Sequence, residues 1–333
     1  MTETHESRSE HLGTIDVRGW RIPVALTLPS SHDPTLPSAI LLIPGSLFSD
    51  VNGDYPSWQA FPHVYAHLAR QLSERGHAVF RFAKLGPGTG SVAIDEAEAA
   101  TVRTWAGRLV IADAAFDAMR RELGARGVVV ERTIVAGHSE GSVVASQLAT
   151  SNRASEIDGV VLLAGPSVGL LDIMREQTRA MTPPDELDAT IARLDAVIAC
   201  IRRGEAVPPA LATGPGMGAT ALAQMPDEAR RYMRETDATD PLELARALVQ
   251  PVLIVQGGRD DSVPEHHGEA LRDALRHRHD GERDTRYVYL PEVSHMFKLV
   301  PSGTPREQAF GYPGPTDARV ADAVDHWIRS KFP

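Results

Sequence analysis

Short apolar runs alternate with amphipathic stretches along most of the chain, and turn-forming residues separate them. Runs of four to eight apolar residues bounded by turn signals are typical of strands that are buried on both faces of a sheet. The sequence predicts strands at Arg21–Leu28, Ala39–Ile43, Ala78–Phe82, Thr133–Ala136, Val160–Leu163, Val252–Val255 and Tyr287–Leu290.

Helical segments are expected between most of these strands. The clearest of them repeats apolar residues at helical spacing and is followed by Gly124, which we interpret as its stop signal. Strands that alternate with helices indicate a mostly parallel sheet covered on both faces, so the predicted fold class is α/β. The apolar residues of this helix are Leu109, Ala112, Phe116, Met119 and Leu123.

The strand pattern disappears between Val168 and Leu248. This segment is helical in composition, is broken by prolines and glycines, and holds five of the eight methionines. We interpret residues 168–248 as a helical lid, whose methionines suit an adaptable apolar pocket or equally fill the lid's own core. Residues 13–167 and 249–333 would then form the catalytic core, and residues 1–12 a disordered tail.

Two G-x-S-x-G pentapeptides come directly after predicted strands, one centred on Ser139 and one on Ser167. Such a pentapeptide can turn sharply from strand to helix and present its serine as a nucleophile. A single match is weak evidence, because a chain with 27 glycines can contain the pattern by chance. The choice between the two serines therefore depends on the strands and reactive groups further along the chain.

Further reactive groups come after the last two predicted strands, at the sheet edge where such groups gather in parallel sheets. Asp260 comes shortly after Val252–Val255, and His295 shortly after Tyr287–Leu290. A serine hydroxyl needs a histidine to remove its proton, and a carboxylate to orient that histidine. The candidates are thus Ser139 as nucleophile, His295 as base and then acid, and Asp260 as the orienting carboxylate.

This order of serine, aspartate and histidine resembles the α/β-hydrolase superfamily over residues 15–333, and most closely its esterase and acyl-hydrolase branch. The motifs that carry the resemblance are Gly-His-Ser-Glu-Gly, Pro-Val-Leu-x-x-Gln-Gly-x-x-Asp-x-x-Val-Pro and Leu-Pro-x-x-x-His-x-Phe. The second motif selects Asp260 over its neighbour Asp261. The resemblance also favours Ser139 over Ser167, because it requires one strand between the nucleophile and the strand that carries the acid.

The same resemblance implies an oxyanion hole made of backbone N–H groups. One would belong to Glu140, and the second to Ser46 or Leu47 in the loop after Ala39–Ile43. Residues 51–56, which continue this loop, either line the entrance of the site or form an ordinary surface turn.

Two departures from the family pattern stand out. Pro44 replaces a histidine, and the segment 82–91 replaces an Asp-x-Arg-Gly-x-Gly-x-Ser motif. The backbone donors of the oxyanion hole do not require the histidine. We expect the second departure to alter local structure rather than the chemistry.

Composition narrows the possible partners. The net charge of −10 argues against nucleic acid and anionic membranes, and no apolar run approaches the length of a membrane span. Cys200 is the only cysteine and the N-terminal residues lack the features of a secretory signal, so a cytoplasmic location is expected. His266 and His267 are expected on a surface helix, and no metal motif or cofactor motif is present.

The sequence therefore predicts a serine hydrolase that cleaves the carboxylic esters of small acyl substrates and needs no cofactor or metal. The same residues would also serve an acyltransferase or a thioesterase. A protein that only binds small molecules on a hydrolase scaffold is the alternative from a different class. The oligomeric state and the physiological substrate are not readable from the sequence.

Overall fold

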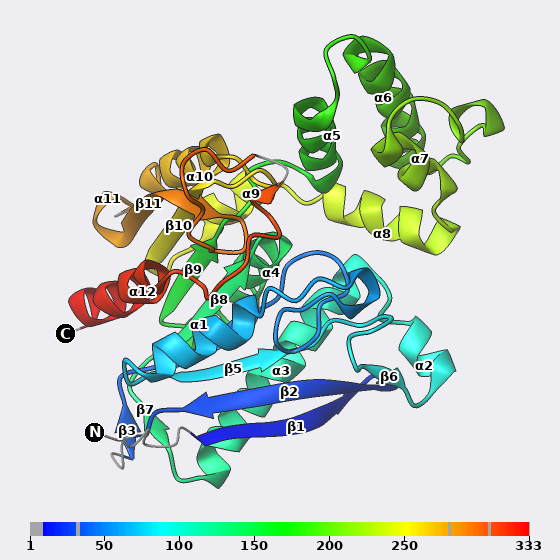
Figure 1. The fold of residues 1–333 in the computed structure, drawn as a ribbon. Helices are drawn as coiled ribbons and strands as arrows, with labels where there is room; N and C mark the ends of the chain where they lie inside the picture. Colours follow the sequence, from blue (N-terminus) through cyan, green and yellow to red (C-terminus); the bar gives the residue numbers. More distant parts are fainter. Residues whose placement is uncertain (1–8, 31–33, 279–280, 306–307, 333) are drawn as a thin grey trace.

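A nine-stranded sheet forms the centre of the computed structural model, which describes residues 9–30, 34–278, 281–305 and 308–332 (Figure 1). The strands from β5 to β11 in the order below run parallel, whereas β2 is antiparallel to β1 and to β5. The order across the sheet is β1 (Ser9–Val17), β2 (Trp20–Leu28), β5 (Ala78–Phe82), β4 (Ala39–Ile43), β8 (Thr133–His138), β9 (Gly159–Leu163), β10 (Val252–Arg259) and β11 (Thr285–Ser294).

All the predicted strands are present, and the α/β prediction is confirmed. The remaining short elements are β6 (Val92–Ala93), which pairs with β2, the separate pair β3 (Thr35–Leu36) and β7 (Val129–Val130), the helices α2 (Glu96–Ala100) and α11 (Gly281–Asp284), and the 3-10 helices η1 (Pro56–Trp58), η2 (Ala154–Glu156) and η3 (Pro209–Leu211).

The apolar pattern does not predict the first strand. Residues 9–12, which we expected in a disordered tail, begin β1, and Ser9 pairs with Leu28 of β2. β1 is an edge strand that is mostly exposed, and only Ile15 and Val17 are buried. It therefore lacks the apolar run on which the prediction relies, and its pairing with β2 holds it instead. Residues 1–8 of the expected tail lie outside the described residues.

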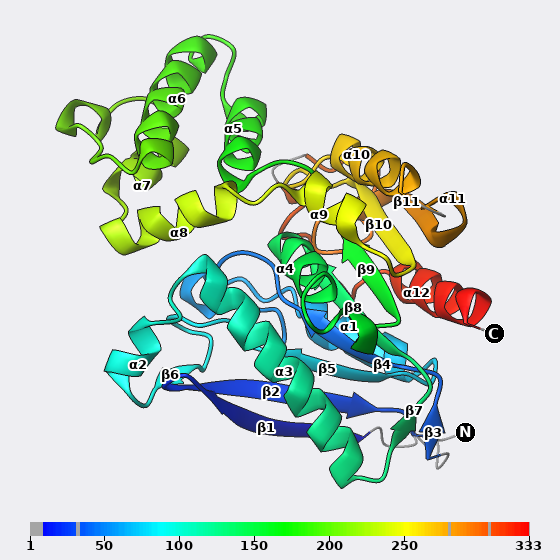
Figure 2. The same ribbon diagram turned by 180° about the vertical axis from the view of Figure 1, so that it is seen from behind.

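Helices cover both faces of the sheet, as Figure 2 shows from behind. Side chains of β4 alternate accordingly: Leu41 and Ile43 join the core of one face, whereas Ile40 and Leu42 join the core of the other. The first face is covered by α3 (Trp105–Ala125), α4 (Glu140–Ala149), α9 (Pro241–Ala247) and α10 (Glu265–Arg276), and the second by α1 (Val64–Ser73) and α12 (Ala318–Lys331).

Residues 168–248 are helical, and four of their helices form a separate group at one side of the sheet (Figure 1). They share a small core of their own, which includes Leu171, Leu194 and Leu222. The last helix, α9, packs instead on α4 and α10, with Ala245 in the core on that face of the sheet. The four grouped helices are α5 (Leu170–Met181), α6 (Leu187–Arg203), α7 (Met217–Gln224) and α8 (Asp227–Asp237).

The long helix α3 ends later than predicted. Gly124 lies inside it, and the chain leaves the helix through Gly127, whose φ is +67°. Glycine adopts this left-handed conformation without a steric penalty, so Gly127 rather than Gly124 is the stop signal. The two glycines stand three positions apart, and the apolar spacing alone does not distinguish them.

These two glycines should respond in opposite ways to replacement by alanine. Gly124→Ala should raise the free energy of unfolding by about 0.5 to 1 kcal/mol, because alanine is favoured inside a helix and no atom lies within 4 Å of the added Cβ. Gly127→Ala should lower it by about 1 kcal/mol, because the new side chain is strained at positive φ. Urea denaturation of both variants measures this, and a change of the same sign in both would contradict the assignment.

Candidate active site

Ser139 lies at the sharp turn between β8 and α4, with φ 54° and ψ −125°. The two flanking glycines make this turn possible. A Cβ at Gly137 would lie 2.0 Å from the carbonyl oxygen of Gly141, and one at Gly141 would lie 2.4 Å from the carbonyl oxygen of Ile43. The pentapeptide thus requires glycine at both positions, and the strained serine between them is turned toward a cavity.

Asp260 lies in the loop after β10, and His295 directly after β11. His295 Nδ1 donates a hydrogen bond of 2.8 Å to Asp260 Oδ2. The other carboxylate oxygen, Asp260 Oδ1, accepts the N–H groups of Ser262 at 2.9 Å and of Val263 at 2.7 Å. These contacts place the ring proton of a neutral His295 on Nδ1 and leave Nε2 as the proton acceptor.

Ser139 and His295 line the same cavity. Within the described part of the chain, Ser139 Oγ makes no hydrogen bond, including none to His295. Such a contact often tightens only when substrate is bound. The structure therefore brings the three predicted residues to one sheet edge, with the Asp260 to His295 contact made and the His295 to Ser139 contact not made.

The rejected alternatives have other surroundings. Asp261 lines the cavity, but its neighbour Asp260 holds His295. Ser167 is buried, its Oγ lies 2.8 Å from His267 Nδ1, and it is not among the residues that line the cavity.

A chain of buried hydrogen bonds connects the loops around Ser139. The N–H of Gly45 donates to the Tyr65 oxygen at 2.7 Å, and the Tyr65 hydroxyl lies 3.1 Å from His138 Nδ1. His138 Nε2 lies 3.0 Å from the carbonyl oxygen of His295. Because that carbonyl can only accept, Nε2 carries the His138 proton and Nδ1 accepts from Tyr65. Burial, together with the nearby His295, lowers the pKa of His138 well below its ordinary value, so His138 is neutral.

The residues with the candidate oxyanion donors, Ser46, Leu47 and Glu140, all line the cavity. Gly45 already donates to Tyr65, whereas the N–H groups of Ser46, Leu47 and Glu140 have no acceptor among the described residues. Glu140 is the first residue of α4, where the helix dipole favours negative charge. Ser46, Glu140 and Ser139 all line the cavity.

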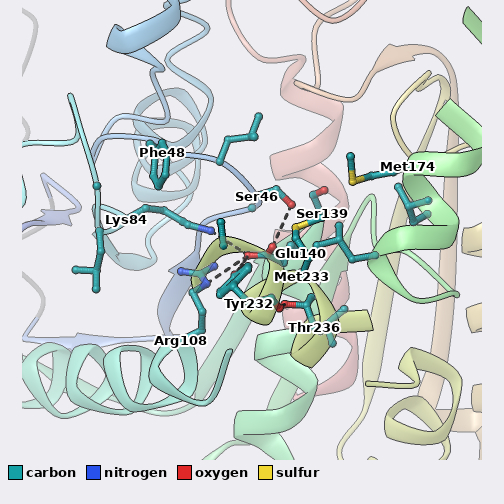
Figure 3. Close-up of a pocket in the computed structure, with 18 of the residues that line it drawn as sticks. Ser46, Phe48, Lys84, Arg108, Ser139, Glu140, Met174, Tyr232, Met233 and Thr236 are labelled. Atoms are coloured by element: carbon teal, nitrogen blue, oxygen red, sulfur yellow. Dashed lines mark hydrogen bonds and ion pairs between the residues drawn. The ribbon is translucent and has the colours of Figure 1, made fainter. Parts of the chain in front are cut away.

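The side chain of Glu140 is the centre of a buried charge cluster that the sequence analysis does not predict (Figure 3). Its carboxylate accepts hydrogen bonds from Lys84 Nζ at 2.9 Å, from the Tyr232 hydroxyl at 3.1 Å and from Ser46 Oγ at 3.3 Å. Arg108 Nε completes the cluster at 3.3 Å. Two cations and one anion thus lie beside Ser139, and Tyr232 reaches the cluster from α8.

The charges in this cluster stabilise one another. Burial alone would raise the pKa of Glu140, but Lys84 and Arg108 outweigh burial and lower it to about 2. Burial lowers the pKa of Lys84 to about 8, and the positive charge of Arg108 adds to this shift. Glu140 is therefore ionised at neutral pH, and Lys84 is mostly protonated.

Some of this cluster has a signal in the sequence. Lys84 comes just after β5, at the sheet edge where reactive groups gather, and Arg108 lies among the buried residues of α3. The segment after β5 was expected to affect only local structure; instead it brings Lys84 into the cavity wall. Tyr232 has no such signal, because its contact with Glu140 joins residues 92 positions apart.

The cavity has a volume of about 1630 Å³ and lies between the sheet edge and the helices α5 and α8. Four of the five methionines of residues 168–248 line it, and Met233 also packs in the small core of these helices. Of the two interpretations of residues 51–56, Tyr55 in the cavity wall favours a place at the site. The lining methionines and aromatic residues are Met174, Met181, Met225, Met233, Met296, Trp20, Phe48, Tyr55, Trp58, Tyr232 and Phe310.

Together, the sheet order, the serine turn and the Asp260 to His295 pair define an α/β-hydrolase. The model of the alpha/beta hydrolase family matches residues 40–309, so the chain belongs to this family. No helix in the described residues is long and apolar enough to cross a membrane.

The individual relatives and solved structures share only a small fraction of identical residues with this chain. The chain is similar to esterase EstD of Thermotoga maritima, with 24% identity over 309 residues that make up 92% of this chain. It spans only 65% of that relative's length. Among solved structures it resembles the esterase Pf2001 of Pyrococcus furiosus, with a TM-score of 0.55 and 13% identity over 98% of this chain and 94% of that one. It also resembles Est1E of Butyrivibrio proteoclasticus, with a TM-score of 0.53 and 15% identity over 96% and 98% of the two chains.

The Glu140 cluster makes a prediction about the pH dependence of stability. The pKa of Glu140 is lowered on folding, so its ionised form stabilises the protein above the unfolded pKa of 4.5, and this contribution is lost as the pH falls toward 2. Glu140→Gln removes the charge and leaves Lys84 and Arg108 without a buried counter-ion. The variant should lose about 3 kcal/mol of unfolding free energy at pH 7.

Urea denaturation of the wild type and Glu140→Gln at several pH values tests this prediction. The difference between the two proteins should shrink as the pH is lowered below about 5, because the wild-type carboxylate becomes protonated. Glu122→Gln, which removes a carboxylate from an exposed ion pair of α3, serves as the control and should cost less than about 1 kcal/mol. A difference for Glu140→Gln that is small or independent of pH would contradict the cluster's role.

Proposed function

We propose that the protein hydrolyses carboxylic esters through an acyl-enzyme formed on Ser139. The observation that carries this proposal is the arrangement of His295: Asp260 holds its Nδ1, and its Nε2 has no partner among the described residues in the cavity that Ser139 also lines. Membership of the alpha/beta hydrolase family and the similarity to proteins named as esterases support the same reaction.

In this proposal, Ser139 Oγ attacks the ester carbonyl carbon while His295 Nε2 removes the hydroxyl proton. The carbonyl oxygen becomes an oxyanion and accepts hydrogen bonds from the N–H of Glu140 and from that of Ser46 or Leu47. The carbon–oxygen bond to the alcohol then breaks, and His295 gives its proton to the leaving alcohol. Water attacks the acyl-enzyme in the same way and releases the acid.

The charge cluster favours this chemistry. A carboxylate so close to the oxyanion would oppose the developing negative charge if it stood alone. Lys84 and Arg108 contact the Glu140 carboxylate directly, so the cluster as a whole carries one positive charge while Lys84 is protonated. The cluster therefore attracts negative charge, and its carboxylate also fixes the Ser46 hydroxyl on the other side of the hole.

The cavity suggests which esters are bound. Its volume of about 1630 Å³ exceeds the roughly 300 to 1,000 Å³ of a typical small-ligand pocket, and methionine and aromatic side chains form much of its wall. We infer that the substrate carries a long or bulky apolar group, and that residues 168–248 act as the lid that shapes its pocket. This extends the expectation of small acyl substrates to larger ones.

Hydrolysis of a graded set of p-nitrophenyl acyl esters tests the proposed function. The wild type should prefer medium or long acyl chains over acetate, and Ser139→Ala should lose activity by a factor of about 10³ or more, because the nucleophile is absent. Labelling by a fluorophosphonate probe should likewise be lost in Ser139→Ala. Equal activity in the two proteins would refute the Ser139 assignment. A wild type that binds esters but neither cleaves them nor reacts with the probe would favour the binding-protein alternative.

Asp260→Asn tests the orientation of His295 separately from folding. The asparagine carbonyl can still accept the N–H groups of Ser262 and Val263, but its NH₂ group would face His295 Nδ1 and favour the wrong tautomer. We expect kcat to fall by a factor of about 10⁴ with a nearly unchanged melting temperature. Asp261→Asn is the matched comparison and should change kcat less than about tenfold. The reverse ranking would assign the acid role to Asp261.

A further inference from the structure

Glu176, His266 and His267 bring three ligand atoms together away from Ser139. Glu176 belongs to α5, and the two histidines belong to the first turn of α10. Glu176 Oε2 lies 3.2 Å from His266 Nε2 and 2.9 Å from His267 Nε2, and all three ligand atoms lie within 4.8 Å of one another. The described residues of the chain hold no second group of this kind.

Two imidazole nitrogens and one carboxylate oxygen suit zinc and similar transition-metal ions. Zinc binds such atoms at about 2.0 to 2.2 Å, which places neighbouring ligands of a tetrahedral site roughly 3.3 Å apart. The two distances from Glu176 Oε2 are close to this spacing, so a metal could join the three atoms after small side-chain movements. A fourth position would remain for water.

His267 already has a partner that can orient it as a ligand. Its Nδ1 lies 2.8 Å from Ser167 Oγ and also accepts the Ser167 N–H at 3.2 Å. Because Nδ1 accepts the Ser167 N–H, the ring proton of a neutral His267 lies on Nε2, toward Glu176. A metal on Nε2 would move this proton to Nδ1, which would then donate to Ser167 Oγ in place of accepting the Ser167 N–H, and the imidazole would remain neutral. A hydrogen bond of this kind behind a metal-bound histidine fixes the ring and strengthens binding.

The site is open on one side. The His267 side chain is fully buried, whereas the side chains of Glu176 and His266 are 37% and 59% exposed. A metal ion can therefore enter from solvent without opening the fold. The buried ligand would anchor it to the core, and Glu176 would attach it to α5.

We propose that Glu176, His266 and His267 bind a zinc-type transition-metal ion that clamps α5 of the lid segment to α10 of the core. A neighbouring contact, from Gln177 Nε2 to the Ser262 carbonyl oxygen at 2.8 Å, already joins α5 to the loop that carries Asp260. The metal would add a stronger link at the same junction. Its role is structural, so the proposal does not depend on ester hydrolysis.

Zinc binding to the full chain tests the proposal. The protein is prepared without a histidine tag, stripped with EDTA and titrated with Zn²⁺ against a chromophoric chelator of known affinity. The wild type should bind about one Zn²⁺ per chain, and Zn²⁺ should raise its melting temperature. Glu176→Gln and His266→Asn should each weaken binding at least about tenfold and abolish the rise in melting temperature.

Suitable controls separate this site from the exposed histidines elsewhere. His277→Asn, at the far end of α10, should bind Zn²⁺ as the wild type does. Glu176 and His266 are partly exposed, so their variants should fold, and an unchanged melting temperature without metal checks this. Stoichiometric binding that is unchanged in Glu176→Gln and His266→Asn would overturn the proposal, as would the absence of stoichiometric Zn²⁺ binding by the wild type.

Discussion

The geometry of the candidate active site depends on one neutral, buried imidazole. His138 links Tyr65, and through it the Gly45 loop, to the main chain of His295. A second proton on His138 would reverse the donor at Nδ1 and leave the Tyr65 hydroxyl, which already accepts from Gly45, without its acceptor. Burial and the nearby His295 exclude that proton by lowering the His138 pKa. The loop with the candidate oxyanion donors and the loop that carries His295 are thus held to the serine turn by a single tautomer.

Glu140 links the same region to the rest of the molecule through its charge. A buried carboxylate must be paired, and its partners come from distant segments: Lys84 after β5 and Arg108 in α3. Arg108 also donates to the carbonyl oxygen of Pro44 at 2.8 Å, so the Pro44 position, one of the two departures from the family pattern, is supported here by an arginine. Both departures from the family pattern are therefore linked to this cluster: Arg108 contacts Pro44, and Lys84 belongs to the segment 82–91. Neither departure can be understood from its own segment alone.

The sequence predicts those parts of the structure that local pattern determines. Continuous apolar runs identify the buried strands, and the positions directly after those strands identify Asp260 and His295. The edge strand β1 is not predicted, because it buries only Ile15 and Val17 and has no continuous apolar run. The cluster around Glu140 and the group around Glu176 are missed for a different reason. Glu140 lies 56 residues from Lys84, 92 from Tyr232 and 94 from Ser46, and Glu176 lies about 90 residues from the two histidines, so only the fold brings these side chains together.

The proposed lid, residues 168–248, contacts the candidate active site through two of its helices. Through α8, the Tyr232 hydroxyl donates to Glu140, and through α5, Glu176 and Gln177 contact His267 and the Ser262 carbonyl. Movement of α8 would break two hydrogen bonds to charged groups, that of Tyr232 to Glu140 and that of the Trp105 N–H to Glu235, at a cost of about 1.5 to 3 kcal/mol each, but Glu140 would keep both of its cations. No buried charge in the Glu140 cluster would be left unpaired. In the proposed lid, α5 and α8 are tied to each other, because the Leu171 N–H at the start of α5 donates to Asp237 at the end of α8 at 3.0 Å. A metal ion at the proposed α5 site would therefore restrain this junction and limit any movement to the part of α8 that carries Tyr232.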